Sequence, residues 1–221
     1  MDTLIVKVKM KVAHIGVIGL GYVGLPLAVE KAKSGFKVLG FDIQSSKVER
    51  VNRGENYIGD IIPQDLKDLV ANGHLSATTD FDRLMECDVV AICVPTPLDK
   101  FKQPDLSYIV NSAKEIAKRI HKDMLIVLES TTYPGTTEEV VKPILEESGL
   151  KVGKDFHLAF SPERVDPGNA RFKTHNTPKV VGGCTSECTE IAKTLYSIVL
   201  GAEVFTVSSP KEAEATKILE N

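Results

Sequence analysis

The sequence predicts an α/β protein with a doubly wound, mostly parallel sheet that carries helices on both faces. Short apolar runs of strand length alternate with longer segments in which apolar residues recur at helical spacing, and this order is typical of βαβ units. Most of the apolar runs end in glycine-rich or polar corners. Right-handed crossovers bring such corners to one edge of a parallel sheet, where open α/β proteins bind ligands. We therefore expect the functional site at the carboxyl ends of the strands.

The expected elements follow one another in a regular order. The apolar runs predict strands over 12–18, 37–41, 89–94, 125–128, 156–160, 179–181 and 204–207. Helices are predicted after the glycines of 19–24, and then over 45–53, 64–71, 106–120 and 187–200. Gly54 and Gly73 are expected to close the helices over 45–53 and 64–71. Thr137 is the expected cap of a further helix that begins with Glu138.

The turn over 19–24, Gly-Leu-Gly-Tyr-Val-Gly, is the most informative motif. Gly19, Gly21 and Gly24 follow the first expected strand and open a helix. In dinucleotide-binding folds of the Rossmann type, such glycines allow a tight turn, close approach of a pyrophosphate and close packing of the helix on the sheet. The helix N-terminus favours the anion through its unpaired N–H groups and its dipole. The alternative is a turn that only packs a helix on a sheet.

Asp42 ends the second expected strand at close to the spacing of about 20 residues after the glycines that a ribose-binding acid requires. A carboxylate there accepts hydrogen bonds from ribose hydroxyls and repels a 2′-phosphate. No arginine directly follows Asp42, because the next residues are Ile43, Gln44 and Ser45. The sequence therefore favours NAD over NADP, although the positive charge of Lys47 weakens that preference slightly.

Composition limits the partners of the protein. Its 221 residues carry a formal net charge of -3, with 27 Lys and Arg against 30 Asp and Glu spread along the chain, so we expect neither nucleic acid nor a membrane as a partner. No apolar run has the length of a membrane span, and the first residues lack the apolar core of a signal peptide, so the expected location is cytoplasmic.

Four cysteines are too few to suggest a disulfide framework. Cys93 lies in an apolar run and is expected to be a buried thiol, and no role is assigned to Cys87. Cys184 and Cys188 are four residues apart and are candidates to share a helix face, but no histidine lies near them at ligand spacing. We therefore expect no metal site.

Three later corners complete a set of four ordered motifs. They are Val-Pro-Thr-Pro at 94–97, Glu-Ser-Thr-Thr-Tyr-Pro-Gly-Thr-Thr at 129–137 and Ser-Pro-Glu-Arg-Val-Asp-Pro-Gly-Asn at 161–169. With the turn at 19–26, they resemble the nucleotide-sugar 6-dehydrogenases that act on UDP-glucose, UDP-N-acetylglucosamine or UDP-N-acetylmannosamine. The resemblance covers 12–221. It is stronger for the N-acetylhexosamine branch, because the UDP-glucose branch usually carries Arg-Glu where this chain has Asp166 and Pro167.

The resemblance implies an oxidoreductase of polysaccharide biosynthesis. Such enzymes oxidise the C6 alcohol of the UDP-sugar to the uronic acid with two NAD⁺ in succession, through an aldehyde and a cysteine-bound thioester. The implied organisation is an NAD-binding domain over 1–208 and the start of a central connecting helix over 209–221. Family members assemble through that helix, so a homo-oligomer, a dimer or larger, is implied for the full-length protein.

The resemblance also implies roles for individual residues. NAD contacts are implied for the three glycines of the turn and for Tyr22, Val23, Asp42, Lys47, Pro95, Thr96, Ser130 and Thr131. Arg164 and Val165 match the loop that holds the sugar nucleotide. Catalytic roles are implied for Thr131, Glu163, Lys217 and Asn221, with Lys217 and Asn221 also facing the substrate from one side of a helix. Without the resemblance, Glu163 would be a helix N-terminal acid or a solvated loop acid, and Lys217 a solvated helix lysine.

The family's catalytic cysteine belongs to a Gly-Gly-x-Cys motif beyond the central helix, and Gly182, Gly183 and Cys184 imitate it only superficially. No helix-capping signal precedes Asn221, so we expect a fragment or truncated product that lacks this cysteine. The alternatives are a stand-alone NAD-binding module without catalysis and a UDP-glucose 6-dehydrogenase. A dehydrogenase of the 6-phosphogluconate or 3-hydroxyacyl type shares the fold but does not account for the Ser-Pro-Glu-Arg corner.

Overall fold

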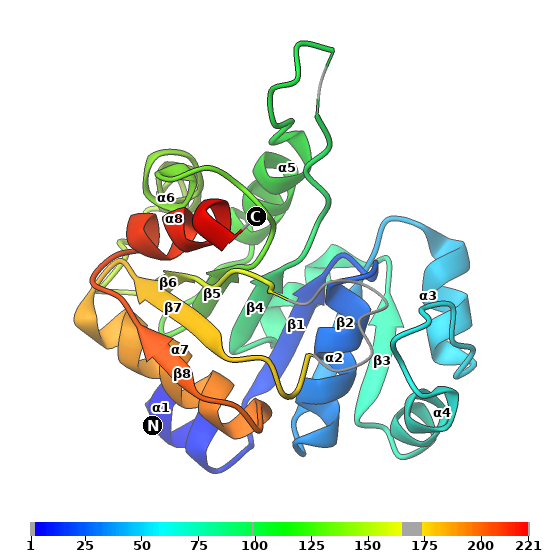
Figure 1. The fold of residues 1–221 in the computed structure, drawn as a ribbon. Helices are drawn as coiled ribbons and strands as arrows, with labels where there is room; N and C mark the ends of the chain where they lie inside the picture. Colours follow the sequence, from blue (N-terminus) through cyan, green and yellow to red (C-terminus); the bar gives the residue numbers. More distant parts are fainter. Residues whose placement is uncertain (1–2, 99, 165–173, 221) are drawn as a thin grey trace.

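The computed structural model describes residues 3–98, 100–164 and 174–220, and within them one sheet of eight strands in the order β3-β2-β1-β4-β5-β6-β7-β8 (Figure 1). Neighbouring strands are parallel except for β6 and β7, which are antiparallel. The strands are β1 (His14–Ile18), β2 (Lys37–Phe41), β3 (Leu75–Thr78), β4 (Val89–Ile92), β5 (Leu125–Leu128), β6 (His157–Phe160), β7 (Lys179–Gly183) and β8 (Val204–Thr206). The predicted doubly wound, mostly parallel fold is confirmed.

Helices cover both faces of this sheet (Figure 1). They are α1 (Leu4–Lys9), α2 (Gly24–Lys33), α3 (Ser45–Asn52), α4 (Pro63–Ala71), α5 (Ser107–Ala117), α6 (Lys142–Glu146), α7 (Ser186–Val199) and α8 (Pro210–Glu220), with a 3₁₀ helix η1 (Phe81–Glu86) and a π-helix η2 (Thr136–Val141). Among these described helices, none combines the length and apolarity that a membrane span requires.

The core forms two layers because successive strand residues point to opposite faces. Val89 and Ala91 of β4 pack with α1, α2 and α7 on one face, whereas Val90 and Ile92 pack with α5 and α6 on the other. The predicted apolar stripe of α5 lies in the second layer, as expected of a core helix.

Five parallel strands end in register at the carboxyl edge. Ile18 pairs with Phe41 and with Ile92, Ile92 pairs with Leu128, and Leu128 pairs with Phe160. The residues that follow these strand ends are therefore placed side by side along one edge. The antiparallel direction of β7 adds its first residue, Lys179, to the same edge.

The sequence did not predict α1, β3 or η1. Leu4 and Val8 of α1 are buried one helical turn apart, but six residues with an apolar-charged alternation carry no clear helical period. The first strand is shorter than predicted, since it begins at His14 while Val12 is 55% exposed. The predicted cap at Thr137 is wrong, because Gly135, with φ 102°, precedes η2 and Thr137 lies inside it.

Candidate functional site

The three glycines of the first turn have different surroundings, and each fits one of the three roles expected of them. Gly19 has φ +94°, and a Cβ there would lie 2.6 Å from the carbonyl oxygen of Cys93. A Cβ on Gly24 would collide with the carbonyl oxygen of Gly19. A Cβ on Gly21 would meet nothing within 4 Å, so this residue faces open space. The turn is thus tight, closely packed on α2, and open where a pyrophosphate would approach.

The peptide groups of Leu20 are held from two sides. Its N–H donates to Asp42 Oδ2 at 2.9 Å, and its carbonyl accepts the hydroxyl of Tyr57 at 2.7 Å. Burial raises the pKa of Tyr57, and the negative charge of Asp42 adds to the effect, so the phenol stays a donor. Tyr57 was not predicted from the sequence, because it lies in a loop after α3 and carries no motif.

Asp42 lines a cavity of about 490 Å³ at the carboxyl ends of β1, β2 and β4. Its Oδ1 accepts the N–H of Gln44 at 2.9 Å, and Lys47 Nζ lies 3.4 Å from its Oδ2. Pro95 and Tyr108 also line this cavity. The volume and the mixture of apolar walls with the carboxylates of Asp42 and Glu115 suit a nucleoside.

The next two corners contact each other. The hydroxyl of Thr96 donates to the carbonyl of Thr131 at 2.7 Å. Ser130 is buried, and its N–H and hydroxyl both donate to the carbonyl of Ile92, at 3.1 and 3.3 Å. The structure therefore brings together Thr96, Ser130 and Thr131, which the sequence analysis placed on one ligand.

The Ser-Pro-Glu-Arg corner begins directly after β6. The hydroxyl of Ser161 donates to the carbonyl of Val180 at 2.8 Å, which fixes the corner against β7. Glu163 Oε1 accepts the N–H of Arg164 at 2.9 Å, and Arg164 Nη1 donates to the carbonyl of Pro178 at 3.0 Å. The guanidinium of Arg164 thus links the corner to the residue that precedes β7.

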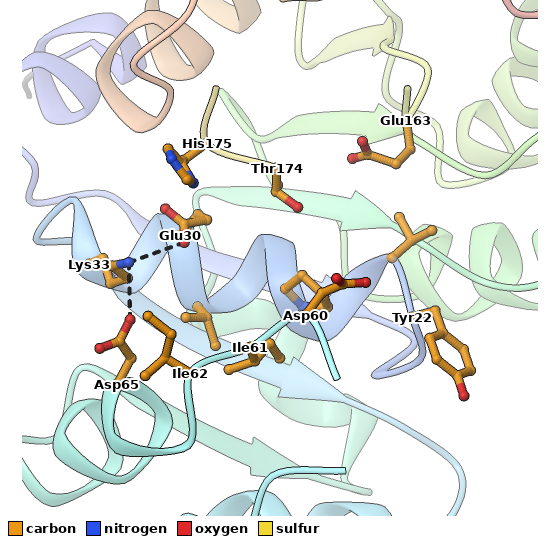
Figure 2. Close-up of a pocket in the computed structure, with 13 residues that line it drawn as sticks. Tyr22, Glu30, Lys33, Asp60, Ile61, Ile62, Asp65, Glu163, Thr174 and His175 are labelled. Atoms are coloured by element: carbon orange, nitrogen blue, oxygen red, sulfur yellow. Dashed lines mark hydrogen bonds and ion pairs between the residues drawn. The ribbon is translucent and has the colours of Figure 1, made fainter. Parts of the chain in front are cut away.

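Glu163 shares a second cavity, of about 170 Å³, with Tyr22 and Val23 of the glycine turn. Figure 2 shows Glu163 and Tyr22 toward the same end of this cavity, whereas Lys33 lies at the other end with ion pairs to Glu30 and Asp65 at 3.3 and 3.1 Å. The corner at 161–164 and the turn at 19–24 are therefore neighbours in space.

Helix α8 contacts β6, β7 and η2, and it carries Lys217, whose side chain is half-buried. Glu214 of α8 anchors the helix. Its buried carboxylate accepts the N–H and the hydroxyl of Thr137 at 2.8 and 2.6 Å and the N–H of Gly135. A carboxylate from another helix therefore caps η2 in place of Thr137. Val165 and Asn221, also predicted as site residues, lie outside the described residues.

A buried charge cluster lies behind these corners, and the sequence analysis missed it. Glu129 is 1% exposed and contacts Lys179 Nζ at 2.7 Å, Lys31 Nζ at 3.4 Å and the hydroxyl of Tyr196 at 2.5 Å. The one signal in the sequence is Lys31 itself, because it falls on the apolar face of α2 beside residues such as Ala28 and Ala32.

The cysteines lie apart from the carboxyl edge or are buried. Cys184 follows β7 and Cys188 lies within α7, so the two do not share a helix face as considered. Cys188 Sγ lies 3.9 Å from Nδ1 of His157 at the opposite, amino end of β6. Among the described residues, no group of three or more histidine, cysteine or acidic side chains is arranged to hold a metal ion.

The glycine turn, the helix behind it and the acid at the end of β2 define a dinucleotide-binding domain of the Rossmann type. A family model described as "UDP-glucose/GDP-mannose dehydrogenase family, NAD binding domain" matches residues 13–200. The chain belongs to this family, and its cofactor is NAD.

Similar proteins agree with this assignment. The chain is 40% identical over 213 residues to a UDP-N-acetyl-D-glucosamine 6-dehydrogenase of Pseudomonas aeruginosa, a match that covers 96% of this chain and 50% of that protein. The structure of a UDP-D-ManNAc dehydrogenase from Pyrococcus horikoshii superposes with a TM-score of 0.88 at 35% identity, over 94% of this chain and 49% of that one. An NDP-N-acetyl-D-galactosaminuronic acid dehydrogenase from Methanosarcina mazei gives 0.88 at 37% identity, over 100% and 50%. The chain spans about half the length of these relatives.

Proposed function

We propose that the protein to which this chain belongs is an NAD-dependent 6-dehydrogenase of UDP-N-acetylglucosamine or UDP-N-acetylmannosamine. The carrying observation is that Glu163, in the Ser-Pro-Glu-Arg corner, lines one cavity with Tyr22 and Val23 of the cofactor turn. A carboxylate beside the cofactor-binding turn is suited to exchange a proton with an alcohol that is being oxidised. The names of the relatives support the substrate class.

The residues of the carboxyl edge fit NAD. The open face at Gly21 and the N-terminus of α2 would hold the pyrophosphate, and Asp42 would hold the adenosine ribose. Pro95, Thr96, Ser130 and Thr131 would contact the rest of the cofactor. When bound, NAD supplies the oxidant that takes two electrons from the alcohol carbon.

The residues proposed to bind the substrate come mainly from the Ser-Pro-Glu-Arg corner and from the C-terminal helix. Arg164 and Val165 would hold the sugar nucleotide, and Glu163 would hold or move the proton of the C6 oxygen or of a water. Lys217 and Asn221, from the helix that we propose to be the start of a central connecting helix, would stabilise negative charge on that oxygen. Thr131 would contribute from the corner that contacts Thr96.

We assign no covalent role to the cysteines of this chain. Burial raises the pKa of Cys87 and of Cys184 to about 12 and raises the pKa of Cys93 well above its usual value, so these thiols are protonated at neutral pH. Burial raises the pKa of Cys188, but hydrogen bonds with His157 and Thr185 outweigh that effect and lower it; this thiol is fully buried at the far edge of the sheet. By itself the 221-residue chain would bind NAD and at most oxidise the alcohol weakly to the aldehyde.

The second candidate is an NAD-binding module without catalysis, because the glycine turn and Asp42 would serve such a module equally well. Incubation of the 221-residue chain and of the full-length natural protein with NAD⁺ and each UDP-sugar separates the two. We expect the full-length protein to form two NADH per uronic acid, whereas the chain alone gives an NAD-dependent thermal shift and no stoichiometric uronic acid. Stoichiometric uronic acid from the chain alone would contradict our proposal for its cysteines.

A thermal shift with NAD, but no shift and no turnover with any UDP-sugar in either protein, would establish the binding module instead. Turnover restricted to UDP-glucose would move the protein to the other branch of the family. A cytoplasmic location and homo-oligomeric assembly belong to the same proposal, and cell fractionation and light scattering of the full-length protein test them.

A further inference from the structure

Lys179 occupies a position that links the buried charge cluster to the candidate acid. It is the first residue of β7, and the antiparallel direction of this strand brings it to the carboxyl edge. Its side chain is 6% exposed. Lys179 Nζ lies 2.7 Å from Glu129 Oε2, 3.6 Å from Glu163 Oε2 and 3.4 Å from the carbonyl oxygen of Pro162.

The cluster contains a second lysine, Lys31, which shares with Lys179 the contacts to Glu129 and Tyr196. Lys31 and Lys179 both pair with Glu129, and their Nζ atoms lie 5.2 and 5.0 Å from the centre of the Tyr196 ring. Of the two lysines, Lys179 contacts the corner at 161–164, through Glu163 and Pro162. A comparison of variants at the two lysines therefore separates the loss of a contact with Glu129 from an effect on Glu163.

Charge distinguishes the two lysines as well. Burial lowers the pKa of Lys31, and the attraction of Glu129 does not offset that effect. Burial also opposes the charge of Lys179, but the carboxylates of Glu129 and Glu163 together raise its pKa. The Lys179 ammonium is therefore held charged, and its charge lies between two carboxylates.

We propose that Lys179 is a positioning residue for Glu163, which rests on the catalytic role proposed for Glu163 above. Glu129, which directly follows β5, and Tyr196 of α7 both contact the ammonium. Its position is therefore set by β5, by α7 and by β7, which carries Lys179. The ammonium in turn holds Glu163 Oε2, while the N–H of Arg164 holds Oε1. A side chain on an irregular corner is thus oriented by the regular core beneath it.

The test compares Lys179→Met with Lys31→Met and Lys179→Arg in the full-length natural protein. Both methionine variants remove a buried lysine from Glu129, so Lys31→Met is the matched control. Since misplacement of a reacting group by about 1 Å costs about 100-fold in rate, we expect Lys179→Met to lower kcat for the UDP-sugar about 10- to 100-fold. We expect Lys31→Met to retain kcat within about 3-fold and Lys179→Arg to recover most of the loss, with KM for NAD⁺ unchanged within about 2-fold in all three.

Crystal structures of the same variants of the 221-residue chain provide a readout that does not need activity. We expect the Glu163 carboxylate to leave its place in Lys179→Met and to keep it in Lys31→Met. If Lys179→Met does not fold, Lys179→Gln replaces it, because an amide can still donate to Glu129 without carrying charge.

The outcomes separate the two proposals. An unmoved Glu163 in Lys179→Met, or an equal loss of kcat in Lys31→Met and Lys179→Met, would overturn the positioning role. A wild-type protein that oxidises no UDP-sugar would instead overturn the proposed function. The crystal structures would then decide alone whether Lys179 orients Glu163.

Discussion

Tyr57→Phe removes a single oxygen that holds the cofactor turn. The Tyr57 hydroxyl donates to the carbonyl of Leu20 at 2.7 Å, while the N–H of Leu20 donates to Asp42. Phenylalanine keeps the ring, whose centre lies 4.9 Å from the guanidinium carbon of Arg50, so packing and the cation–π contact remain. The substitution therefore tests the hydrogen bond and little else.

The expected cost follows from the burial of the acceptor. A hydrogen bond contributes about 1 kcal/mol net, and a buried acceptor left without a partner costs about 1–3 kcal/mol, so we expect Tyr57→Phe to lose about 1–2 kcal/mol of unfolding free energy. If the turn relaxes in the free protein and must reorder around NAD, part of the same energy is lost from binding. Because 1.4 kcal/mol is about tenfold in an equilibrium constant, the Kd for NAD⁺ should rise about 3- to 10-fold.

Urea denaturation and calorimetric titration with NAD⁺ measure the two effects on the 221-residue chain. Tyr133→Phe is the matched control, since the Tyr133 side chain is exposed and the same oxygen is lost from a different place. A loss of stability with an unchanged Kd would refute the idea that Tyr57 preorganises the turn. No change in either quantity would show that the hydrogen bond is energetically neutral.

Three further substitutions test the edge and the far side of the sheet. Asp42→Asn should weaken NAD⁺ about 10-fold and improve NADP⁺, because the amide still accepts the N–H of Leu20 but no longer repels a 2′-phosphate; titrations with both cofactors measure this. Glu214→Ala should cost about 2 kcal/mol in urea denaturation, because it leaves the buried N–H and hydroxyl of Thr137 without their acceptor, and an unchanged midpoint would contradict the cap. Burial by itself lowers the pKa of His157, but the hydrogen bond and the charge of Cys188 raise it above 6.5. The stability that the protonated imidazole contributes is therefore full below pH 6.5 and is lost as the pH rises through the folded pKa. His157→Gln should flatten that decline, and equal pH dependence in both proteins would count against it.

Local patterns predicted the order and geometry of the glycine turn, α2 and Asp42. The glycines, α2 and Asp42 are close in sequence, and their spacing expresses the geometry of one βαβ unit. The thiol of Cys93 is buried as its apolar run indicated. The register that aligns the strand ends follows from the parallel fold, so the corners could be expected at one edge.

The supporting residues could not be predicted in this way because their contacts are long-range. Tyr57 reaches back to Leu20, and Glu214 reaches Thr137 from another helix. Lys179 has the appearance of a lysine that begins an exposed strand. Its role depends on the antiparallel direction of β7, and the apolar pattern of a buried strand is the same in either direction. Thr137 was mistaken for a cap because a threonine before two acids fits a local rule.

The in-register ends of the strands set the length of ligand that the edge accommodates. Asp42 follows β2 and Glu163 lies just beyond β6, and four strand intervals separate these strands in the order β2-β1-β4-β5-β6. At about 4.8 Å per interval, the edge between them extends roughly 19 Å. A mononucleotide does not cover that distance, whereas two nucleotides joined by a pyrophosphate approach it. The spacing of the strands would therefore let an extended dinucleotide contact Asp42, the proposed ribose acid, at one end and approach Glu163, the proposed proton-transfer acid, at the other.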